Sequence, residues 1–434
     1  MHLKASFHTL GCKLNFAETA TIAKMLEGKG IYKVEKGETP DFCVVNTCSV
    51  TETADKKARN LIRKLAKNYP QSSIIVTGCY AQLKPDEISS LPGVVMVLGS
   101  NEKLKISQFI DDWFINNQKR ISISDALTTP LFMPSCEKGD RTRFFLKVQD
   151  GCDYFCTYCT IPFARGRGRS GKIADLVGMA EDVVNKGGKE IVITGVNIGT
   201  FGKDSGEDLL SLLKELDKIK GIERFRISSI EPNLLTDSII KWIAKDSRAF
   251  MPHFHIPLQS GSDKVLRLMN RRYDTTLFKS RIDSIRSLIP DAYIGVDIIA
   301  GARGETQYEW HKSLEFANSL DIAKFHVFPY SERPGTKALL LGDIIPMEER
   351  RKRVEILTKL SDKKNKDFII RNLGKKRMVL WETARNKETL TGLTDNYIRV
   401  EAPFFNGFIN NISPVILEKV KEPSSELATA QHIK

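Results

Sequence analysis

Eight cysteines are distributed over the 434 residues of the chain, and three of them lie close together. The segment GCDYFCTYC holds Cys152, Cys156 and Cys159, called here the clustered triad. Thiolates at this spacing on one loop can bind three irons of a cubane 4Fe–4S cluster and leave the fourth iron without a protein ligand. Zinc is the alternative, but the sequence has no nearby histidine to complete its four ligands. The pattern therefore favours an iron–sulfur cluster with one open iron.

A second set of three cysteines is spread along the first part of the chain. Cys12, Cys48 and Cys79, called here the dispersed triad, each follow a short β-branched run, in TLGC, VVNTC and VTGC. If these runs are strands of one parallel sheet, their carboxyl ends meet at one edge, where ligands bind. The dispersed triad thus predicts a second site with three thiolates. Cys43 and Cys136 lie within a strand and a connecting stretch, and we expect neither to do chemistry.

The charge balance indicates an anionic partner. Lys and Arg number 66 against 53 Asp and Glu, which gives a net charge of +13 and a pI near 9.2. Nucleic acid is one such partner, although net charge alone does not identify it. No apolar run approaches the ~18 residues that span a bilayer, and the first residues lack the apolar core of a secretory signal. We therefore expect a cytoplasmic protein without a membrane segment, in which the thiols stay reduced.

Strands must carry both triads, and the dispersed one requires a small parallel sheet. Residues 1–125 alternate short apolar runs with helix-like stretches, which predicts an N-terminal parallel-sheet α/β domain. The expected strands are Ala5 to Leu10, Phe42 to Val45, Ile74 to Thr77 and Val94 to Leu98. The stretch from Thr128 to Arg141 contains two prolines and a glycine, and we expect a linker there.

The alternation restarts on a larger scale in residues 138–370. Six strands are expected, and they begin at Phe144, Glu190, Arg224, His253, Tyr293 and Lys324. Six strand-helix units predict an open (β/α) barrel with chemistry at the carboxyl ends of its strands. A long basic helix over residues 347–370 follows, and a solvated face is its simplest explanation. Residues 371–434 predict a small antiparallel β-barrel of the oligonucleotide-binding kind.

The cysteine motifs resemble one known family. TLGCKLN, VVNTCSVT, VTGCYAQ and GCDYFCTYCTIPFARGRGRSG are similar to the radical S-adenosylmethionine (SAM) methylthiotransferases, and the similarity extends over essentially the whole chain. The residues Gly11 to Asn15 are most similar to the bacterial type that modifies N6-threonylcarbamoyladenosine at tRNA position 37. The resemblance implies a methylthiotransferase N-terminal domain, a radical SAM domain and a C-terminal TRAM domain.

The resemblance also implies cofactors and a mechanism. The clustered triad would hold a 4Fe–4S cluster that binds SAM and cleaves it to methionine and a 5′-deoxyadenosyl radical. The dispersed triad would hold a second 4Fe–4S cluster that carries sulfur, which a second SAM methylates. A methylthio group would then be added to carbon 2 of the adenine. The implied partners of this monomer are a tRNA anticodon stem-loop and a low-potential electron donor such as flavodoxin or ferredoxin.

Polar residues near the expected strand ends are candidates for contacts with SAM and RNA. The candidates for SAM are Gly195, Asn197, Glu231 and Gln259. The candidates for RNA are Arg165, Arg167, Arg169, Arg271 and Arg272, because arginines bind phosphate. Helix caps and solvated turns are the alternative explanation for both sets.

One loop departs from the pattern of the family that the chain resembles. Where the family usually has GFPGET, this chain has GARGET from Gly301 to Thr306, so that Ala302 and Arg303 replace an aromatic residue and a proline. The sequence does not determine how this change affects activity.

The alternative functions are methylthiolation of isopentenyladenosine in tRNA, methylthiolation of a ribosomal protein, and RNA binding without catalysis by a protein whose metals are structural.

Overall fold

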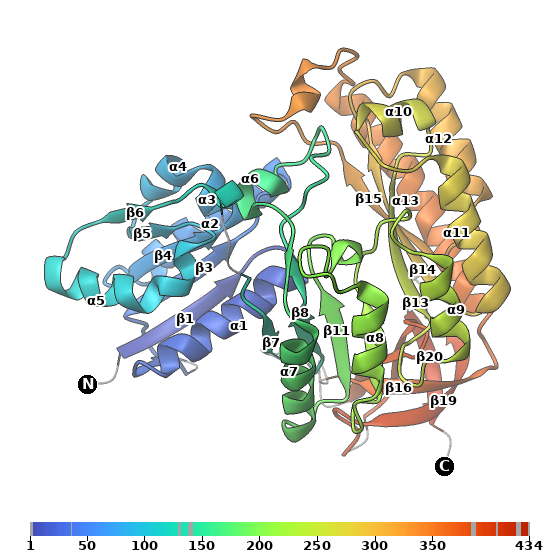
Figure 1. The fold of residues 1–434 in the computed structure, drawn as a ribbon, viewed down its shortest axis with the longest axis horizontal. Coiled ribbons are helices and arrows are strands. Elements are labelled where there is room, and N and C mark those ends of the chain that lie inside the picture. The colour runs from blue at the N-terminus through green and yellow to red at the C-terminus, as the bar shows by residue number, and fades with distance from the viewer. Residues whose placement is uncertain are drawn as a thin grey trace.

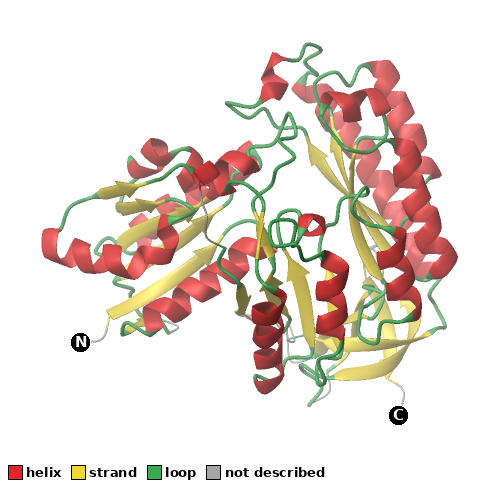
Figure 2. Ribbon diagram, in the orientation of Figure 1, coloured by secondary structure: helices red, strands yellow, loops and turns green. Residues whose placement is uncertain are grey.

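The computed structural model describes residues 3–35, 37–128, 132–137, 142–382, 388–404, 407–421 and 427–432. Three β-structures follow one another along the chain (Figure 1). The N-terminal sheet lies to one side, a larger barrel of parallel strands stands beside it, and a small closed barrel lies at the base of the larger one (Figure 2). The fold is α/β, as the alternating sequence pattern predicts.

The N-terminal sheet has six parallel strands in the order β2-β1-β3-β4-β5-β6. Its strands are β1 (Leu3–Thr9), β2 (Ile31–Lys33), β3 (Phe42–Thr47), β4 (Ser73–Gly78), β5 (Val94–Leu98) and β6 (Arg120–Ser122). Its helices are α1 (Lys13–Glu27), α2 (Glu52–Asn68), α3 (Cys79–Leu83), α4 (Pro85–Ser89) and α5 (Ile106–Asn116). Separate apolar cores pack against its two faces, one around Ile22 and Phe109 and the other around Ile62 and Tyr80. The four expected strands are present, whereas β2 and β6 are three-residue edge strands, too short for a periodic signal.

The central barrel is open and has six parallel strands, as expected. They are β8 (Phe144–Lys147), β11 (Glu190–Thr194), β12 (Arg224–Ile227), β13 (His253–Gln259), β14 (Tyr293–Ala300) and β15 (Lys324–Pro329). Strands β8, β11 and β12 form one sheet and β13, β14 and β15 another, and two parallel bridges, Phe225 to Phe250 and Ser229 to His255, join them. The helices between these strands are α7 (Ile173–Asn185), α8 (Leu209–Asp217), α9 (Asp237–Lys245), α11 (Thr275–Leu288) and α12 (Gln307–Ser319). They enclose the largest apolar core of the described residues.

Part of the expected linker is a strand. β7 (Ser135–Glu137) pairs antiparallel with β8, and Cys136 lies opposite Leu146. The first strand of an open barrel has a free edge, and a short extended segment satisfies its backbone groups. Cys136 is 3% exposed and belongs to the barrel core. The proposed domain bounds 1–125, 138–370 and 371–434 stay predictions.

The C-terminal strands form a closed five-stranded barrel in the order β16-β17-β18-β20-β19. They are β16 (Lys376–Trp381), β17 (Thr389–Thr394), β18 (Arg399–Pro403), β19 (Ile412–Val420) and β20 (Leu427–His432). The expected barrel is confirmed, and one pairing differs, because β18 and β20 run parallel. This barrel closes the base of the central one: Arg224 donates to Leu393 O at 3.0 Å, and Tyr397 stacks on His253 at 4.0 Å.

The long helix α13 (Met347–Ile370) is only partly solvated. Arg350 and Arg353 lie on its buried face, with side chains 5% and 3% exposed. Arg353 donates to the buried carboxylate of Glu305 at 2.9 Å. Within the part of the chain that the structure describes, no helix has the length and apolar character needed to cross a membrane.

Candidate active site

The clustered triad lies on a tightly held loop beyond β9 (Gln149–Asp150). Gly151 has a φ of +69°, and a Cβ there would lie 1.9 Å from the carbonyl oxygen of Arg167, so only glycine fits. The Cys152 amide donates to Gly166 O at 3.0 Å. On the other side, the Thr157 hydroxyl donates to Leu268 O at 2.8 Å, at the end of α10 (Asp263–Leu268). These contacts fix the loop that presents the three thiols.

The surroundings of the three thiols suit bound iron. Burial, together with the neighbouring Cys156, raises the pKa of Cys159 to about 12, so its thiol is protonated until a metal displaces the proton. Arg271 Nη1 lies 3.2 Å from Cys156 Sγ, where it stabilises the thiolate form. Asn197 Nδ2 lies 3.9 Å from Cys152 Sγ. The Cys159 sulfur accepts a hydrogen bond from the backbone of Ile161, so all three sulfur atoms have a polar partner.

The four SAM candidates lie at the carboxyl ends of three adjacent strands. Gly195 and Asn197 follow β11, Glu231 follows β12, and Gln259 ends β13 with a φ of +64° at a register irregularity. Asn197 Oδ1 is buried without a hydrogen-bond partner, and such an acceptor suits the ammonium group of an amino acid. Arg271 donates to the Glu231 carboxylate, and burial nevertheless raises the pKa of Glu231. These residues fit a cofactor that carries an amino acid group.

The dispersed triad gathers at the ends of β1, β3 and β4. Gly11 has a φ of +107°, and a Cβ there would lie 2.5 Å from the Cβ of Cys48, so the loop before Cys12 touches the loop of Cys48. Gly78, which precedes Cys79, has a φ of +96° and approaches Thr47 equally closely. Burial, together with the neighbouring Cys79 and Cys12, raises the pKa of Cys48 to about 12. The three thiols therefore share one site at this edge of the sheet.

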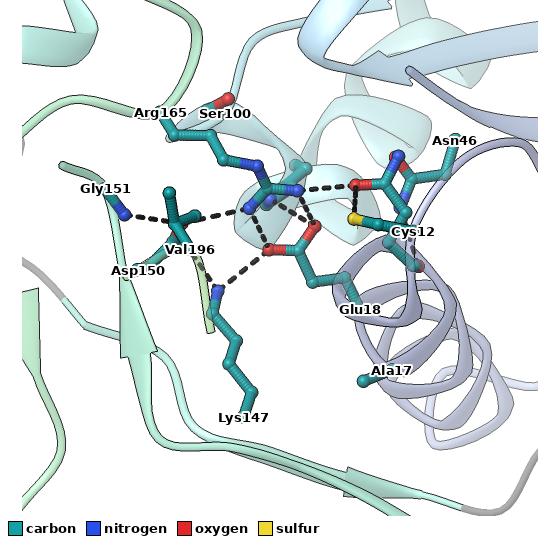
Figure 3. A network of polar contacts seen from close by, with 12 residues as sticks. Cys12, Ala17, Glu18, Asn46, Ser100, Lys147, Asp150, Gly151, Arg165 and Val196 are labelled. Carbon is teal, nitrogen blue, oxygen red and sulfur yellow. Dashed lines mark hydrogen bonds and ion pairs between the residues drawn. The ribbon is translucent and has the colours of Figure 1, made fainter. Parts of the chain in front are cut away.

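A buried ion network joins this edge to the barrel (Figure 3). Arg165, at the end of α6 (Ile161–Arg165), donates to Glu18 and Asp150 at 3.0 Å each. Lys103 and Lys147 each lie 2.8 Å from the Glu18 carboxylate. These three cations hold the pKa of Glu18 well below its usual range, although burial opposes them. The network is a polar contact between the N-terminal sheet and the barrel.

Two arginines expected to bind RNA are instead buried. The side chains of Arg165 and Arg271 are 2% and 4% exposed, and carboxylates occupy both guanidinium groups, so neither is open to a phosphate. Arg169 is 11% exposed and bonds Asp150 at 3.3 Å. Arg167 is 64% exposed, and Arg272 is exposed above the Tyr154 ring. Arg167 and Arg272 therefore remain the accessible candidates.

Residues 330–341, called here the strap, connect the surroundings of both triads. Arg333 donates to Ser49, the neighbour of Cys48, at 2.7 Å. The Ala338 amide donates to the carbonyl of Thr157, within the clustered triad's loop, at 2.8 Å. The unusual Arg303 donates to Leu339 O at 2.8 Å and pairs with Glu332 at 3.1 Å. Arg303 therefore fixes the strap through its backbone and carboxylate contacts.

A cavity of about 410 Å³ lies between the N-terminal sheet and the barrel. The first loop and the start of α1 form one wall, and residues of β8, β11 and β13 and of the segment after β12 form the other. Its lining residues are Thr9, Gly11, Cys12, Lys13, Leu14, Phe16, Phe145, Thr194, Gly195, Ser228, Ser229 and His255. Cys12 of the dispersed triad and the SAM candidate Gly195 thus border one space.

The donor set of each triad fits an iron–sulfur cluster. Among the described residues, no three His, Cys, Asp or Glu side chains are spaced to hold a single metal ion. In a cubane, by contrast, each thiolate binds a different iron, and three thiolates leave one iron open.

Similarity to characterised proteins identifies the family. The chain is 36% identical to threonylcarbamoyladenosine tRNA methylthiotransferase MtaB of Bacillus subtilis, covering 97% of this chain and 95% of that protein. It is 38% identical to the Thermotoga maritima protein of the same name, covering 91% and 90%. The chain belongs to the radical SAM methylthiotransferase family. It is therefore an enzyme that transfers sulfur-containing groups, and this family uses SAM and a 4Fe–4S cluster.

Other comparisons agree with this assignment. The model of the uncharacterized protein family UPF0004 matches residues 4–99 of this methylthiotransferase, and that of the radical SAM superfamily matches residues 146–317. The tRNA-2-methylthio-N(6)-dimethylallyladenosine synthase of Dictyoglomus thermophilum is 31% identical, covering 95% of each chain. The radical SAM methyltransferase TsrM of Kitasatospora setae shares the fold at 13% identity, with a TM-score of 0.57 over 78% of this chain and 74% of that one.

Sequence reasoning missed three groups around this site. They are the network at Glu18, the strap at Arg333, and the charged lumen that contains Lys13 and His255. A usable signal was the presence of charged residues inside apolar strands, as in FFLK and HFHIP, because a charge in a buried strand needs a partner. Nothing in the sequence predicts the contact between Arg333 and Ser49, because the two residues are 284 positions apart.

Proposed function

We propose that this methylthiotransferase adds a methylthio group to carbon 2 of N6-threonylcarbamoyladenosine at position 37 of tRNA, and that SAM serves both as methyl donor and as radical source. In this proposal the clustered triad holds the 4Fe–4S cluster that binds SAM. The dispersed triad holds a second 4Fe–4S cluster. A low-potential donor such as flavodoxin or ferredoxin supplies electrons to a monomeric, cytoplasmic enzyme.

The main support for this proposal is the cavity beside Cys12. One wall belongs to the loop of the dispersed triad, and the other holds Gly195, which precedes the partner of Cys152, Asn197. A base bound there lies between the two triads in one pose, as transfer of a group between two centres requires. Such a base must first be splayed out of the anticodon loop. When bound, the two clusters and SAM supply the radical and the methylthio sulfur.

The protein's own residues would prepare this reaction. Arg271 bonds both Cys156 and Glu231, so it holds the clustered triad against the proposed SAM contacts. Phe16 and Phe145, edge to face at 5.7 Å, form an apolar wall that excludes water from the base. The strap joins Ser49 to the loop of Thr157 and so keeps the two triads at a fixed separation.

The relatives support tRNA as the substrate class. The B. subtilis and T. maritima proteins are named for threonylcarbamoyladenosine in tRNA, and the D. thermophilum protein for dimethylallyladenosine in tRNA. The identity is higher to the first two, at 36% and 38% against 31%. The net charge of +13 suits RNA better than a side chain of a ribosomal protein.

Mass spectrometry of nucleosides tests the proposal. The reconstituted protein is incubated anaerobically with SAM, sulfide, a strong reductant and tRNA from a strain that lacks methylthio groups. We expect N6-threonylcarbamoyladenosine to gain a methylthio group and dimethylallyladenosine to stay unchanged. The reverse result would assign the isopentenyladenosine function, and the absence of any methylthiolated nucleoside would contradict tRNA as substrate.

A further inference from the structure

Lys13 is a charged side chain in the cavity wall for which the mechanism above has no use. It directly follows Cys12, begins α1 and lines the cavity. Among the described residues it makes no hydrogen bond and no ion pair. An ammonium group in such a position loses solvation without gaining a partner, which is unfavourable. A group of this kind is suited to receive an anion.

The charges around Lys13 do not neutralise it. Glu190 is a lumen carboxylate that acts on Lys13, but Arg226 already bonds that carboxylate at 2.9 Å. Arg224 and Arg143 lie 3.8 and 4.0 Å from the same carboxylate, and Arg143 also pairs with Glu382 at 3.2 Å. Two carboxylates thus face three guanidinium groups before Lys13 is counted, and the lumen keeps an excess of positive charge.

The polar groups across the cavity from Lys13 also suit an anion with hydroxyl groups. His255 Nε2 lies 2.7 Å from Asp297 Oδ1, so that pair is closed and leaves Lys13 uncompensated. Ser228 and Ser229, which follow β12, add hydroxyl groups to the wall opposite Lys13. Leu14 and Phe16, on the same wall as Lys13, are apolar and suit the face of a base.

We propose that Lys13 is a specificity-determining residue that binds the carboxylate of the N6-threonylcarbamoyl group. This inference rests on the proposed function and deepens it. In adenine, C2 and C6 are both bonded to N1, so a substituent on N6 lies near C2. A base that presents C2 to the dispersed triad therefore brings its N6 substituent to the residue next to Cys12. A dimethylallyl group carries no charge and would leave the ammonium unpaired, so it is rejected.

The α-carboxylate of SAM is the other carboxylate that could reach Lys13. The two sources differ in their dependence on RNA, since SAM binds whether or not the base is present. The test therefore measures the binding of SAM and of RNA separately.

The experiment compares synthetic anticodon stem-loops that differ only at the carboxylate. One carries N6-threonylcarbamoyladenosine, a second its methyl ester and a third dimethylallyladenosine, and fluorescence anisotropy gives their affinities for the wild-type protein without SAM. We expect the acid to bind about tenfold or more tighter than the ester, the effect of a hydrogen bond to a charged group. In Lys13→Met the acid and the ester should bind equally. Lys24→Met is the matched control, because Lys24 lies on the same helix with its side chain 67% exposed.

The outcomes separate this inference from the proposed function. Equal binding of the acid and the ester by the wild type would overturn the inference, even if the enzyme methylthiolates threonylcarbamoyladenosine in tRNA. Because this comparison uses the wild-type protein, it does not depend on whether a variant folds. Loss of SAM binding in Lys13→Met without RNA, with the preference for the acid intact, would assign Lys13 to SAM and also overturn it. A wild type that methylthiolates only dimethylallyladenosine would overturn the proposed function itself.

Discussion

The clustered triad lies on one loop between Cys152 and Cys159, whereas the dispersed triad is assembled from the ends of β1, β3 and β4. In the first, the chain alone brings the three thiols together, and hydrogen bonds to Gly166, Leu268 and Ala338 then fix the loop. The second requires correct strand order, two glycines that allow close approach, and Arg165 from beyond the other triad. Tertiary contacts thus support the first site, whereas the second exists only because of them.

Cysteine replacement gives the largest expected difference between the triads. Cys156→Ala should abolish reductive SAM cleavage, because the electron donor to SAM is lost. Cys48→Ala should retain some cleavage but form no methylthiolated nucleoside. Chromatography of 5′-deoxyadenosine and mass spectrometry of the nucleosides measure the two effects. The control is Cys43→Ala in β3, the strand that Cys48 follows. A normal rate of methylthiolation by Cys48→Ala would refute the assignment of the second cluster.

Loss of Arg165 should damage the contact on which the dispersed triad depends. Arg165→Met removes one of the cations that the buried Glu18 and Asp150 share, Lys147 being another, which should lower the free energy of unfolding by about 3–5 kcal/mol. Urea denaturation measures this change. The exposed Arg167→Met should stay within about 0.5 kcal/mol of the wild type. Similar values for the two variants would show that the network does not stabilise the interface.

Replacing two glycines that both have a positive φ distinguishes the cost of a steric clash from the cost of backbone strain. Gly11→Ala meets Cys48, whereas Gly30, with a φ of +80°, has no atom within 4 Å of an added Cβ. Strain in the left-handed region should cost both variants about 1–2 kcal/mol. Gly11→Ala should lose a further ~1–3 kcal/mol from overpacking. The bound iron of Gly11→Ala should also fall to that of the clustered triad alone, and equal iron content in both variants would contradict this.

Low pH should remove the stabilisation that the buried ion network around Glu18 provides to the folded protein. The folded-state pKa values of Glu18 and Asp150 are depressed by Arg165 and Lys147, so their stabilisation is complete above the unfolded pKa of about 4 and is lost as the pH falls through the folded values. Glu18→Gln should therefore be less stable than the wild type at pH 7 by about 2–3 kcal/mol, and this difference should shrink steadily below about pH 4. A difference that stays constant down to pH 2 would mean that Glu18 is not stabilised as a carboxylate.

The smallest expected effect concerns RNA. Arg272 is exposed beside the clustered triad, and Arg272→Ala should weaken stem-loop binding similarly for all bases at position 37. The slope of log affinity against log salt should fall by about one. The control is Lys359→Ala on α13, where Lys359 is 75% exposed and paired with Glu355. An unchanged slope in Arg272→Ala would remove Arg272 from the RNA interface.

Much of the architecture could be predicted from local patterns. The six barrel strands were found because apolar runs alternate with helical periods, and the spacing of Cys152, Cys156 and Cys159 needs only one loop. The edge strand at Ser135 was missed because three residues carry no period. The roles of Arg165 and Arg271 were misjudged, because a basic loop has the same composition whether its guanidinium groups face solvent or buried carboxylates.

Residue types and their order along the chain are enough to reveal the chemistry available to this protein: two sets of three thiols, strands to carry them and a positive charge for an anionic partner. Which of these groups meet depends on the folded chain. It brought Arg333 to Ser49 and placed Lys13 opposite His255 across one cavity. The physical reason is that spacing along the chain fixes neighbours within a loop or helix, whereas contacts between distant elements depend on how their buried faces and charges pack together.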